Sequence, residues 1–341
     1  MNRTSSILVT GGAGFVGSHL VERLLADGKS VRVLDDLSTG SLDNLRAVRS
    51  HPRLRIELGK VSESQHLDEW LTETESVYHL AAVVGVDLVI QSPLRTIQTN
   101  LRETGVMLEA ASRHRVPLLL TSTSEVYGKS QKAVFAEDDD LLIGPPHLGR
   151  WCYACSKLMD EFLALAYGKE QGLPVVIVRL FNTVGPRQTG RFGMVLPRFI
   201  AAARHNQPLR VFGTGQQTRC FCDVGDAIEA LVRLQNCPAA RNQVFNVGGA
   251  EEIGILDLAK RVKDLIGSAS TIEQVPYDQA YVPGFEDMQR RKPLTDKLAQ
   301  TIGFRPATPL QTIIQRLVQA QDSGGPGPGK TLRGPPGPLK P

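Results

Sequence analysis

Residues 7–35 constrain the fold of this chain more than any other part of its sequence. They begin with a short apolar run, turn through a cluster of glycines and continue with apolar residues at helical spacing; the glycines are Gly11, Gly12, Gly14 and Gly17. This order predicts a strand, a tight turn and a helix. Glycines let the backbone approach a pyrophosphate closely, and the N-terminus of the helix attracts its negative charge. The stretch therefore predicts a dinucleotide-binding unit.

The residue that ends the second predicted strand indicates which dinucleotide is bound. Asp35 follows Gly17 by eighteen residues, where a carboxylate accepts hydrogen bonds from the adenosine ribose. The same carboxylate would repel a phosphate on that ribose, and the next residues, Asp36, Leu37 and Ser38, include no arginine. We therefore expect NAD rather than NADP as the cofactor.

Strands and helices alternate along the first half of the chain. We expect further strands at residues 54–58, 77–82, 116–121 and 175–180, a helix at 93–114 and another after Tyr153. This alternation, without hairpin signals, predicts an α/β fold built on a doubly wound parallel Rossmann sheet. Ligands of such sheets lie beyond the carboxyl ends of the strands.

After residue 180 the pattern loosens into short helical pieces separated by Pro- and Gly-rich turns, which predicts a smaller mixed C-terminal substrate lobe. We expect an NAD-binding domain from residues 1–180, completed by about 220–247. The substrate-binding lobe would comprise 181–219 and 248–321. Residues 322–341, rich in Gly and Pro, are expected to form a disordered tail.

Composition argues against several other classes of protein. Of the formal charge of +4, most comes from the basic residues of the tail, so the body is nearly balanced and offers no nucleic-acid footprint. No apolar run approaches the roughly 20 residues that a membrane helix needs, and we expect a cytoplasmic protein. Five cysteines without a secretion signal indicate reduced thiols, and their spacing gives little support for a zinc site, so we expect no metal.

A tyrosine and a lysine four residues apart, Tyr153 and Lys157, would project from one face of a helix. A free tyrosine has a pKa of about 10, but a neighbouring ammonium group favours the phenolate and lowers that pKa. We therefore expect Tyr153 to act as a base. The hydroxyl groups of residues 121–124 end a sheet strand at the ligand edge, where they would orient a substrate hydroxyl.

Together these residues carry a resemblance that covers nearly all of residues 7–320. The sequence resembles the extended short-chain dehydrogenases/reductases of the NAD-dependent nucleotide-sugar epimerase/dehydratase family. The matching segments are TGGAGFVGSHL, VLDDLSTG, YHLAA, TSTSEVYG, YACSK, RLFNTVGPR and GTGQQTRCF.

The resemblance implies roles for individual residues. Thr123 would polarise the sugar 4-hydroxyl, Tyr153 would take its proton, and Lys157 would assist Tyr153 and contact the nicotinamide ribose, while hydride passes to NAD and leaves a 4-keto sugar. The expected cofactor set is Gly11, Gly14, Phe15, Val16, Gly17, Asp35, Leu80, Ala81, Ala82, Asn100, Tyr153 and Lys157. The expected substrate set is Asn182, Arg187, Phe212, Arg219 and Arg291, with Asn182 and Arg219 on the nucleotide diphosphate.

Three further positions bear on the reaction. Ser124 and Glu125 stand where dehydratases of the family carry an Asp-Glu pair, and the Ser-Glu pair is similar to that of the UDP-glucuronate decarboxylases. Arg291 begins an Arg-Lys-Pro motif that resembles a substrate-binding motif of the same enzymes. We expect Arg291 to hold the diphosphate or an enolate oxygen and Glu125 to assist proton delivery. The alternative for the motif is a surface ion pair between Glu286 or Asp287 and Arg290 or Arg291.

The resemblance thus favours decarboxylation of UDP-glucuronate to UDP-xylose. The closest alternative is a UDP-hexose or UDP-hexuronate 4-epimerase; a 4,6-dehydratase and a non-catalytic NAD-binding protein are weaker ones. Relatives dimerise through helices that correspond to residues 93–114 and 154–171, so we expect a homodimer. Its expected substrate is a UDP-linked nucleotide sugar.

Overall fold

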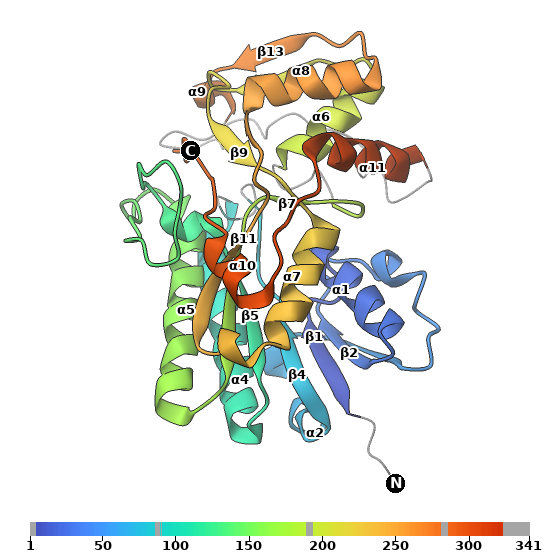
Figure 1. The fold of residues 1–341 in the computed structure, drawn as a ribbon, viewed down its shortest axis with the longest axis vertical. Helices are drawn as coiled ribbons and strands as arrows, with labels where there is room; N and C mark the ends of the chain where they lie inside the picture. Colours follow the sequence, from blue (N-terminus) through green and yellow to red (C-terminus); the bar gives the residue numbers. More distant parts are fainter. Residues whose placement is uncertain (1–4, 86–88, 90, 189–193, 281–285, 323–341) are drawn as a thin grey trace, which may run out of the picture.

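A seven-stranded sheet forms the centre of the structure, a computed structural model that describes residues 5–85, 89, 91–188, 194–280 and 286–322 (Figure 1). Its order is β11, β6, β5, β4, β1, β2, β3, and all neighbouring strands are parallel. The strands are β1 (Ser6–Thr10), β2 (Ser30–Asp35), β3 (Leu54–Leu58), β4 (Thr74–His79), β5 (Leu118–Thr123), β6 (Val175–Leu180) and β11 (Gln243–Val247). The predicted doubly wound Rossmann sheet is confirmed.

Helices cover both faces of this sheet. Helices α1 (Phe15–Ala26) and α7 (Val224–Gln235) pack on one face, and α2 (Leu67–Leu71), α4 (Pro93–His114) and α5 (Trp151–Gln171) on the other (Figure 1). The strands supply both layers because successive side chains point to opposite faces. In β1, Ile7 and Val9 join the first core while Leu8 joins the second.

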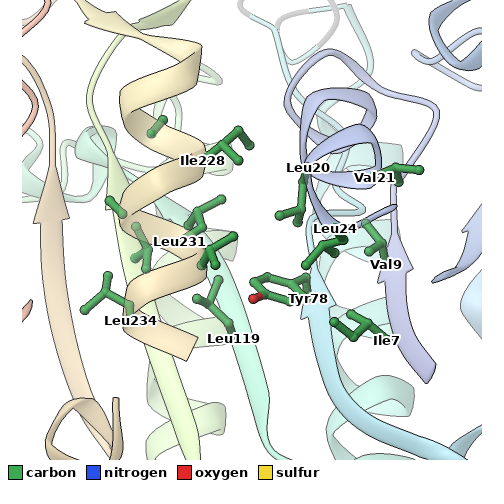
Figure 2. Close-up of a cluster of buried hydrophobic side chains, with 14 of the residues drawn as sticks. Ile7, Val9, Leu20, Val21, Leu24, Tyr78, Leu119, Ile228, Leu231 and Leu234 are labelled. Atoms are coloured by element: carbon green, nitrogen blue, oxygen red, sulfur yellow. The ribbon is translucent and has the colours of Figure 1, made fainter. Parts of the chain in front are cut away.

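Figure 2 shows the core between the sheet and helices α1 and α7. Leu231 of α7 lies near Tyr78 of β4 and Leu119 of β5, and all three side chains are buried. Because Tyr78 is far larger than its aliphatic neighbours, it fills the space between the two helices. This packing fixes both helices on the sheet, and α1 in turn carries the glycine turn at its N-terminus.

Several boundaries differ from the predicted ones by a few residues. Strand β4 spans Thr74–His79 rather than 77–82, because the amide of Leu80 makes a last bond to the Thr10 carbonyl and the Val83 amide then bonds to Asn100. Strand β5 continues to Thr123 because its pairing with β6 does. Helix α5 begins at Trp151, so Tyr153 lies inside its first turn rather than before it.

A second group of elements packs around its own core at the end of the molecule beyond the carboxyl ends of the strands (Figure 1). Its helices are α6 (Val195–Arg204), α8 (Ile255–Ile266) and α11 (Leu310–Asp322). Small sheets pair β8 (Leu209–Phe212) with β13 (Ile272–Val275), β9 (Thr218–Cys220) with β12 (Glu252–Gly254), and β7 (Thr183–Val184) with β10 (Cys222–Asp223).

Short helical elements lie in the connections between these longer helices and strands. They are η1 (Leu42–Leu45), η2 (Val61–Glu63), η3 (Ser124–Tyr127), η5 (Pro238–Ala240), α9 (Tyr277–Ala280) and α10 (Asp296–Ile302). Leu298 of α10 packs in the core of the seven-stranded sheet, although the predicted substrate lobe included it. The predicted disordered tail lies outside the described residues, apart from Asp322 at the end of α11. None of the described helices combines the length and apolar character that a bilayer crossing needs.

Replacing Leu231 with Ala should lower the free energy of unfolding by about 2–5 kcal/mol, because the substitution removes buried methyl groups and leaves a cavity beside Tyr78. Urea denaturation followed by circular dichroism measures the change. The control is Leu265→Ala, since Leu265 of α8 is 39% exposed and its truncation should cost far less. Equal losses in the two variants would contradict this account of the core.

Candidate active site

The turn between β1 and α1 is built so closely that two of its glycines are required. A Cβ on Gly17 would lie 2.1 Å from the carbonyl oxygen of Gly11. Gly11 has a φ of +71°, which side chains disfavour, and a Cβ there would lie 2.8 Å from the amide nitrogen of Ala81. The bare backbone therefore brings the N-terminus of α1 to the edge of a cavity, where its free N–H groups favour an anion.

That first cavity has a volume of about 260 Å³ and lies at the carboxyl ends of β1, β2, β4 and β5. Its lining includes, from the expected cofactor set, Gly11, Gly14, Phe15, Val16, Gly17, Asp35, Leu80, Ala81, Ala82, Tyr153 and Lys157. Gly59, Lys60 and Val61, which follow β3, also line it. The strand ends and the glycine turn thus converge on one elongated space, as the sequence predicted.

Asp35 stands at the end of β2 with its carboxylate facing backbone amides. The carboxylate accepts hydrogen bonds from the amides of Ala13 and Leu37, each at 2.8 Å. Burial raises the pKa of Asp35, although these amide bonds act to lower it. The bonds fix the carboxylate at the cavity wall, where a ribose hydroxyl is expected.

Helix α5 places Tyr153 and Lys157 on the wall of the same cavity. The Nζ of Lys157 lies 2.8 Å from Oδ2 of Asp160, and both side chains are almost fully buried. We expected the Lys157 ammonium to lower the pKa of Tyr153, and the structure contradicts this. Burial and the negative charge of Glu125 raise the pKa of Tyr153, while a hydrogen bond with Thr123 and the charge of Arg291 act in the other direction. The ammonium is instead paired with Asp160.

A second cavity, of about 320 Å³, adjoins the first. Thr123 and Tyr153 line both cavities, so a group bound in one meets a group bound in the other at these two hydroxyls. The second cavity is lined further by Ser124, Glu125, Asn182, Phe212, Arg219 and Arg291 from the predicted set. The structure therefore brings residues from six separate segments of the chain into one space.

Glu125 is the centre of a chain of alternating charges in this second cavity. Its Oε2 lies 2.8 Å from Nη1 of Arg150, and its Oε1 lies 3.0 Å from Nη2 of Arg291. Burial alone would raise the pKa of Glu125, but the charges of Arg150 and Arg291 outweigh it and lower that pKa. Glu125 is therefore an ionised carboxylate near neutral pH, with each oxygen held by a different guanidinium group.

Asp287 extends the chain toward Arg219. Its Oδ1 lies 3.3 Å from Nη2 of Arg150, and its Oδ2 lies 2.8 Å from Nη2 of Arg219. Burial opposes ionisation, yet the nearby arginines lower the pKa of Asp287 as well. The cavity thus presents three guanidinium groups against two carboxylates along this chain, an excess of positive charge that suits an anionic ligand.

Asn182 joins the chain of charges to the sheet. Its Oδ1 accepts a hydrogen bond of 3.2 Å from Nη1 of Arg291, and its Nδ2 donates one of 2.9 Å to the carbonyl of Cys220. Ser124 has a buried hydroxyl oxygen that makes no hydrogen bond within the part of the chain that the structure describes. Both residues follow the ends of central strands, which is why they reach the cavity.

Two predicted residues lie apart from the described lining of either cavity. Asn100 is buried between the Val83 amide and the Ser156 hydroxyl, so it supports the loop after β4 rather than facing the cofactor space. Arg187 pairs with Glu22 of α1 and donates to the Asn44 carbonyl, which turns it away from the second cavity. Both positions have the same cause, because partners that are distant in sequence bind the side chain. The expected roles of the two residues in binding stay predictions.

The Arg-Lys-Pro motif separates its two arginines. Arg291 is nearly buried against Glu125, whereas Arg290 is 44% exposed and pairs with Glu252 at 2.6 Å. The surface ion pair considered from sequence therefore applies to Arg290, with a partner other than the expected ones.

Comparison with known proteins places this geometry in a family. Residues 8–317 match the model of the GDP-mannose 4,6 dehydratase family, which is well over half of the chain. The chain belongs to this family. The resemblance predicted from the motifs is thereby confirmed, since this family lies among the NAD-dependent epimerases and dehydratases.

Relatives within and around the family carry decarboxylase and epimerase names. A UDP-N-acetyl-alpha-D-glucosaminuronate decarboxylase of Bacillus cytotoxicus is 37% identical over 314 residues, covering 92% of this chain and 96% of the relative. UDP-glucuronic acid decarboxylase 1 of Danio rerio is 36% identical over 318 residues, covering 92% and 72%. A Bacillus cereus UDP-glucuronic acid 4-epimerase, solved with UDP-glucuronic acid and NAD, superposes with a TM-score of 0.83 at 28% identity, covering 93% of this chain and 99% of the epimerase.

Sequence reasoning missed three charged residues of this family member's site: Arg150, Asp160 and Asp287. Two of them had a detectable signal. Arg150, Tyr153, Lys157 and Asp160 are spaced by three, four and three residues, so they form one stripe along α5. Asp287 had no such signal, because it lies in an irregular loop and its partners, Arg150 and Arg219, are distant in sequence.

The five cysteines are all free. Among the described residues no cluster of three or more His, Cys, Asp or Glu side chains is arranged to hold a metal ion. Burial raises the pKa of the Cys222 thiol, which indicates a packed side chain rather than a reactive one. The expectation of a metal-free site stays a prediction.

Replacing Gly17 with Ala should abolish tight binding of NAD, because the new methyl group would lie 2.1 Å from the Gly11 carbonyl and force the turn open. Isothermal titration calorimetry with NAD measures the affinity, and circular dichroism reports whether the variant folds. Gly149→Ala is the matched control, since a Cβ at Gly149 meets no atom within 4 Å. A folded Gly17→Ala protein with unchanged affinity would overturn the placement of the pyrophosphate at this turn.

Proposed function

We propose that the chain is an NAD-dependent nucleotide-sugar decarboxylase that acts through a transient 4-keto sugar, and that UDP-glucuronate, converted to UDP-xylose, is its substrate. The observation that carries the proposal is the position of Glu125, held between Arg150 and Arg291 beside Thr123 and Tyr153. The decarboxylase names of the relatives support it.

NAD is the cofactor of this enzyme, as it is in the Bacillus cereus neighbour. The first cavity fits it, because Gly11 and Gly17 leave the helix N-terminus open to a pyrophosphate and Asp35 faces the wall where the ribose belongs. Bound NAD supplies the hydride acceptor for C4 of the sugar and returns the hydride at the end of the cycle. Tyr153 and Lys157 would flank its nicotinamide end.

Oxidation at C4 requires a proton acceptor, and we assign this role to Tyr153. Thr123 would hydrogen-bond the sugar 4-hydroxyl and Tyr153 would take its proton, because both hydroxyls lie where the two cavities meet. The raised pKa of Tyr153 means that its phenolate needs nearby positive charge. Arg291 supplies such charge on the substrate side, and Lys157 stands one helical turn away on α5.

Loss of carbon dioxide follows from the chemistry of a β-keto acid. When the bond between C5 and the carboxylate breaks, its electron pair moves into the 4-carbonyl and forms an enolate, which hydroxyl and guanidinium groups stabilise. A proton then adds to C5 and the ketone is reduced. Because Arg150 and Arg291 keep Glu125 ionised, Glu125 must accept a proton before it can deliver one. The expected role in proton delivery is thus retained with this order of steps.

A 4-epimerase would use the same first step. In such an enzyme the 4-keto intermediate rotates and receives hydride on its other face. The structural likeness to the UDP-glucuronic acid 4-epimerase favours this second candidate. Ser124 argues against a 4,6-dehydratase, since a hydroxyl group is a poor acid for expelling the 6-hydroxyl. The presence of Thr123, Tyr153 and Lys157 together argues against a non-catalytic NAD-binding protein.

Incubation with UDP-glucuronate in the presence of NAD should release carbon dioxide and yield a UDP-pentose, detected by mass spectrometry. Tyr153→Phe should lower kcat by about 10²–10⁴-fold because it removes the proton acceptor. Tyr167→Phe, farther along α5, is the matched control and should keep full activity. UDP-N-acetylglucosaminuronate and UDP-glucose complete the panel.

Each product mass distinguishes one candidate. A product of unchanged mass and altered configuration would favour the epimerase, and loss of water would favour the dehydratase. No turnover with any nucleotide sugar of the panel would contradict the proposal that the chain is a nucleotide-sugar enzyme. Carbon dioxide from UDP-N-acetylglucosaminuronate alone would keep the decarboxylase and change the sugar.

We also infer the division of labour between the two parts of the chain. Residues 1–180 with 220–247 would bind NAD, and 181–219 with 248–321 would bind the nucleotide sugar, with the exception of α10, which packs on the sheet. The two cavities support this division because the first is lined mostly by the former part and the second by both. A cytoplasmic location stays a prediction from the sequence.

A homodimer through helices α4 and α5 is the assembly that we propose. Leu94 and Ile97 of α4 and Met159 and Phe162 of α5 are exposed, with Leu94 and Phe162 more than 60% accessible. Exposed apolar side chains on two adjacent helices suit burial against a second copy of the same pair.

Phe162→Asp should convert a dimer into a monomer, because a charge in the centre of an apolar contact carries a desolvation cost. Light scattering coupled to size-exclusion chromatography measures the mass. Leu265→Asp, at an exposed position of α8, is the control and should leave the mass unchanged. A Phe162→Asp protein that remains dimeric would refute this interface.

A further inference from the structure

Arg150 stands immediately before α5 and points inward. It is the N-cap residue of the helix, and 5% of its surface is exposed. It precedes Tyr153 by three residues, which places both side chains on one face of the helix at the wall of the second cavity. A long charged side chain in such a buried position needs partners that satisfy its donors.

Within the described parts of the chain, the guanidinium group of Arg150 donates to acceptors in three residues. Its Nη1 donates to Glu125 at 2.8 Å, its Nη2 to Asp287 at 3.3 Å, and its Nε to the carbonyl of Glu286 at 3.2 Å. Glu125 follows β5, whereas Glu286 and Asp287 belong to the loop that leads to Arg291. The planar fork of one side chain therefore joins the start of α5, the end of β5 and this loop.

Each carboxylate that Arg150 holds also binds a second arginine. The other oxygen of Glu125 meets Arg291, and the other oxygen of Asp287 meets Arg219. Without Arg150, Glu125 would keep its ion pair with Arg291 and Asp287 its ion pair with Arg219, and each carboxylate would be free to draw that cation toward itself. Such an uncompensated arrangement is costly, so the side chains would move.

We propose that Arg150 is a positioning residue that aligns Glu125 with the reacting carbon and, through Asp287, keeps Arg219 and Arg291 apart for the anionic groups of the substrate. This inference rests on the proposed function, since it assigns a part in that reaction to a residue that neither the motifs nor the relatives' names single out. Arg150 acts through Glu125 and Asp287 and needs no contact with the sugar itself.

Two substitutions distinguish the effect of the charge of Arg150 from the effect of its planar, forked shape. Arg150→Gln removes the charge and the fork, whereas Arg150→Lys keeps the charge and loses the fork. Misplacement of Glu125 should lower kcat by about tenfold to a hundredfold in both variants. Arg219, drawn toward Asp287, should bind the diphosphate less well, so the affinity for UDP should fall as well.

The pH profile distinguishes positioning from a merely structural role. Glu125 faces Arg150, Arg291, Asp287 and Tyr153, and of these the two arginines favour its ionised form. In Arg150→Gln one of the two arginine charges that oppose the effect of burial is gone and that of Arg291 remains, so the pKa of Glu125 should rise. Activity that depends on ionised Glu125 would then be lost at mildly acidic pH where the wild type still works. Arg150→Lys should keep the acid limb close to that of the wild type.

The experiment measures carbon dioxide release from UDP-glucuronate across the acidic and neutral range for the wild type, Arg150→Gln, Arg150→Lys and the control Arg49→Gln. Arg49 is exposed, and its variant should match the wild type. Calorimetry with UDP and thermal unfolding are recorded for each protein. The expected result is a lower kcat in both Arg150 variants, an acid limb shifted upward in Arg150→Gln alone, and weaker UDP binding in folded protein.

Two results would overturn the inference: an acid limb in Arg150→Gln that coincides with that of the wild type, or UDP affinity in both folded variants equal to that of the wild type. If Arg150→Gln does not fold, Arg150→Lys decides by its kcat and its UDP affinity. If the proposed function itself is wrong, the result is different, because the wild type will then release no carbon dioxide. In that event the UDP affinities alone decide the role of Arg150.

Discussion

The rest of this site depends on the two ion pairs that Glu125 forms, one with Arg150 and one with Arg291. One carboxylate, buried at the end of β5, is held by Arg150 from the start of α5 and by Arg291 from a loop more than a hundred residues later. Burying charge is expensive unless each oxygen is satisfied, so the three segments must meet in one arrangement. That arrangement sets the wall of the second cavity and the charge that Tyr153 experiences.

The two cavities meet at Thr123 and Tyr153, and this junction is what the Rossmann topology provides. In a doubly wound sheet the carboxyl ends of the central strands open to one edge, where a glycine turn can receive a pyrophosphate. The second group of elements, built around its own core, closes over that edge with arginines. A cofactor space formed by backbone and a substrate space formed by charged side chains are thus brought into contact by hydroxyl groups that belong to both.

The backbone-defined part of the site was predictable from sequence, and the charge-defined part was not. Gly11, Gly17 and Asp35 line the cavity where their spacing indicated, because a local turn and a strand end fix them. Asn100 and Arg187 line neither cavity as described, since Ser156 and Glu22, far away in sequence, bind their side chains, and their expected roles stay predictions. The pKa of Tyr153 was predicted in the wrong direction because the burial of its phenol group and the approach of Glu125 arise only on folding.

The sequence by itself determined the alternation of strands and helices, the glycine turn and the Tyr-Lys spacing, since each depends on residues within a few turns of one another. The tertiary structure alone decided which charges became neighbours, because ion pairs such as those of Arg150 and Asp287 join side chains whose separation along the chain carries no periodic signal. The spacing of residues along the chain determines the local backbone geometry. The electrostatics of a buried site depends on distances in space and on exclusion of water, and these exist only in the folded molecule.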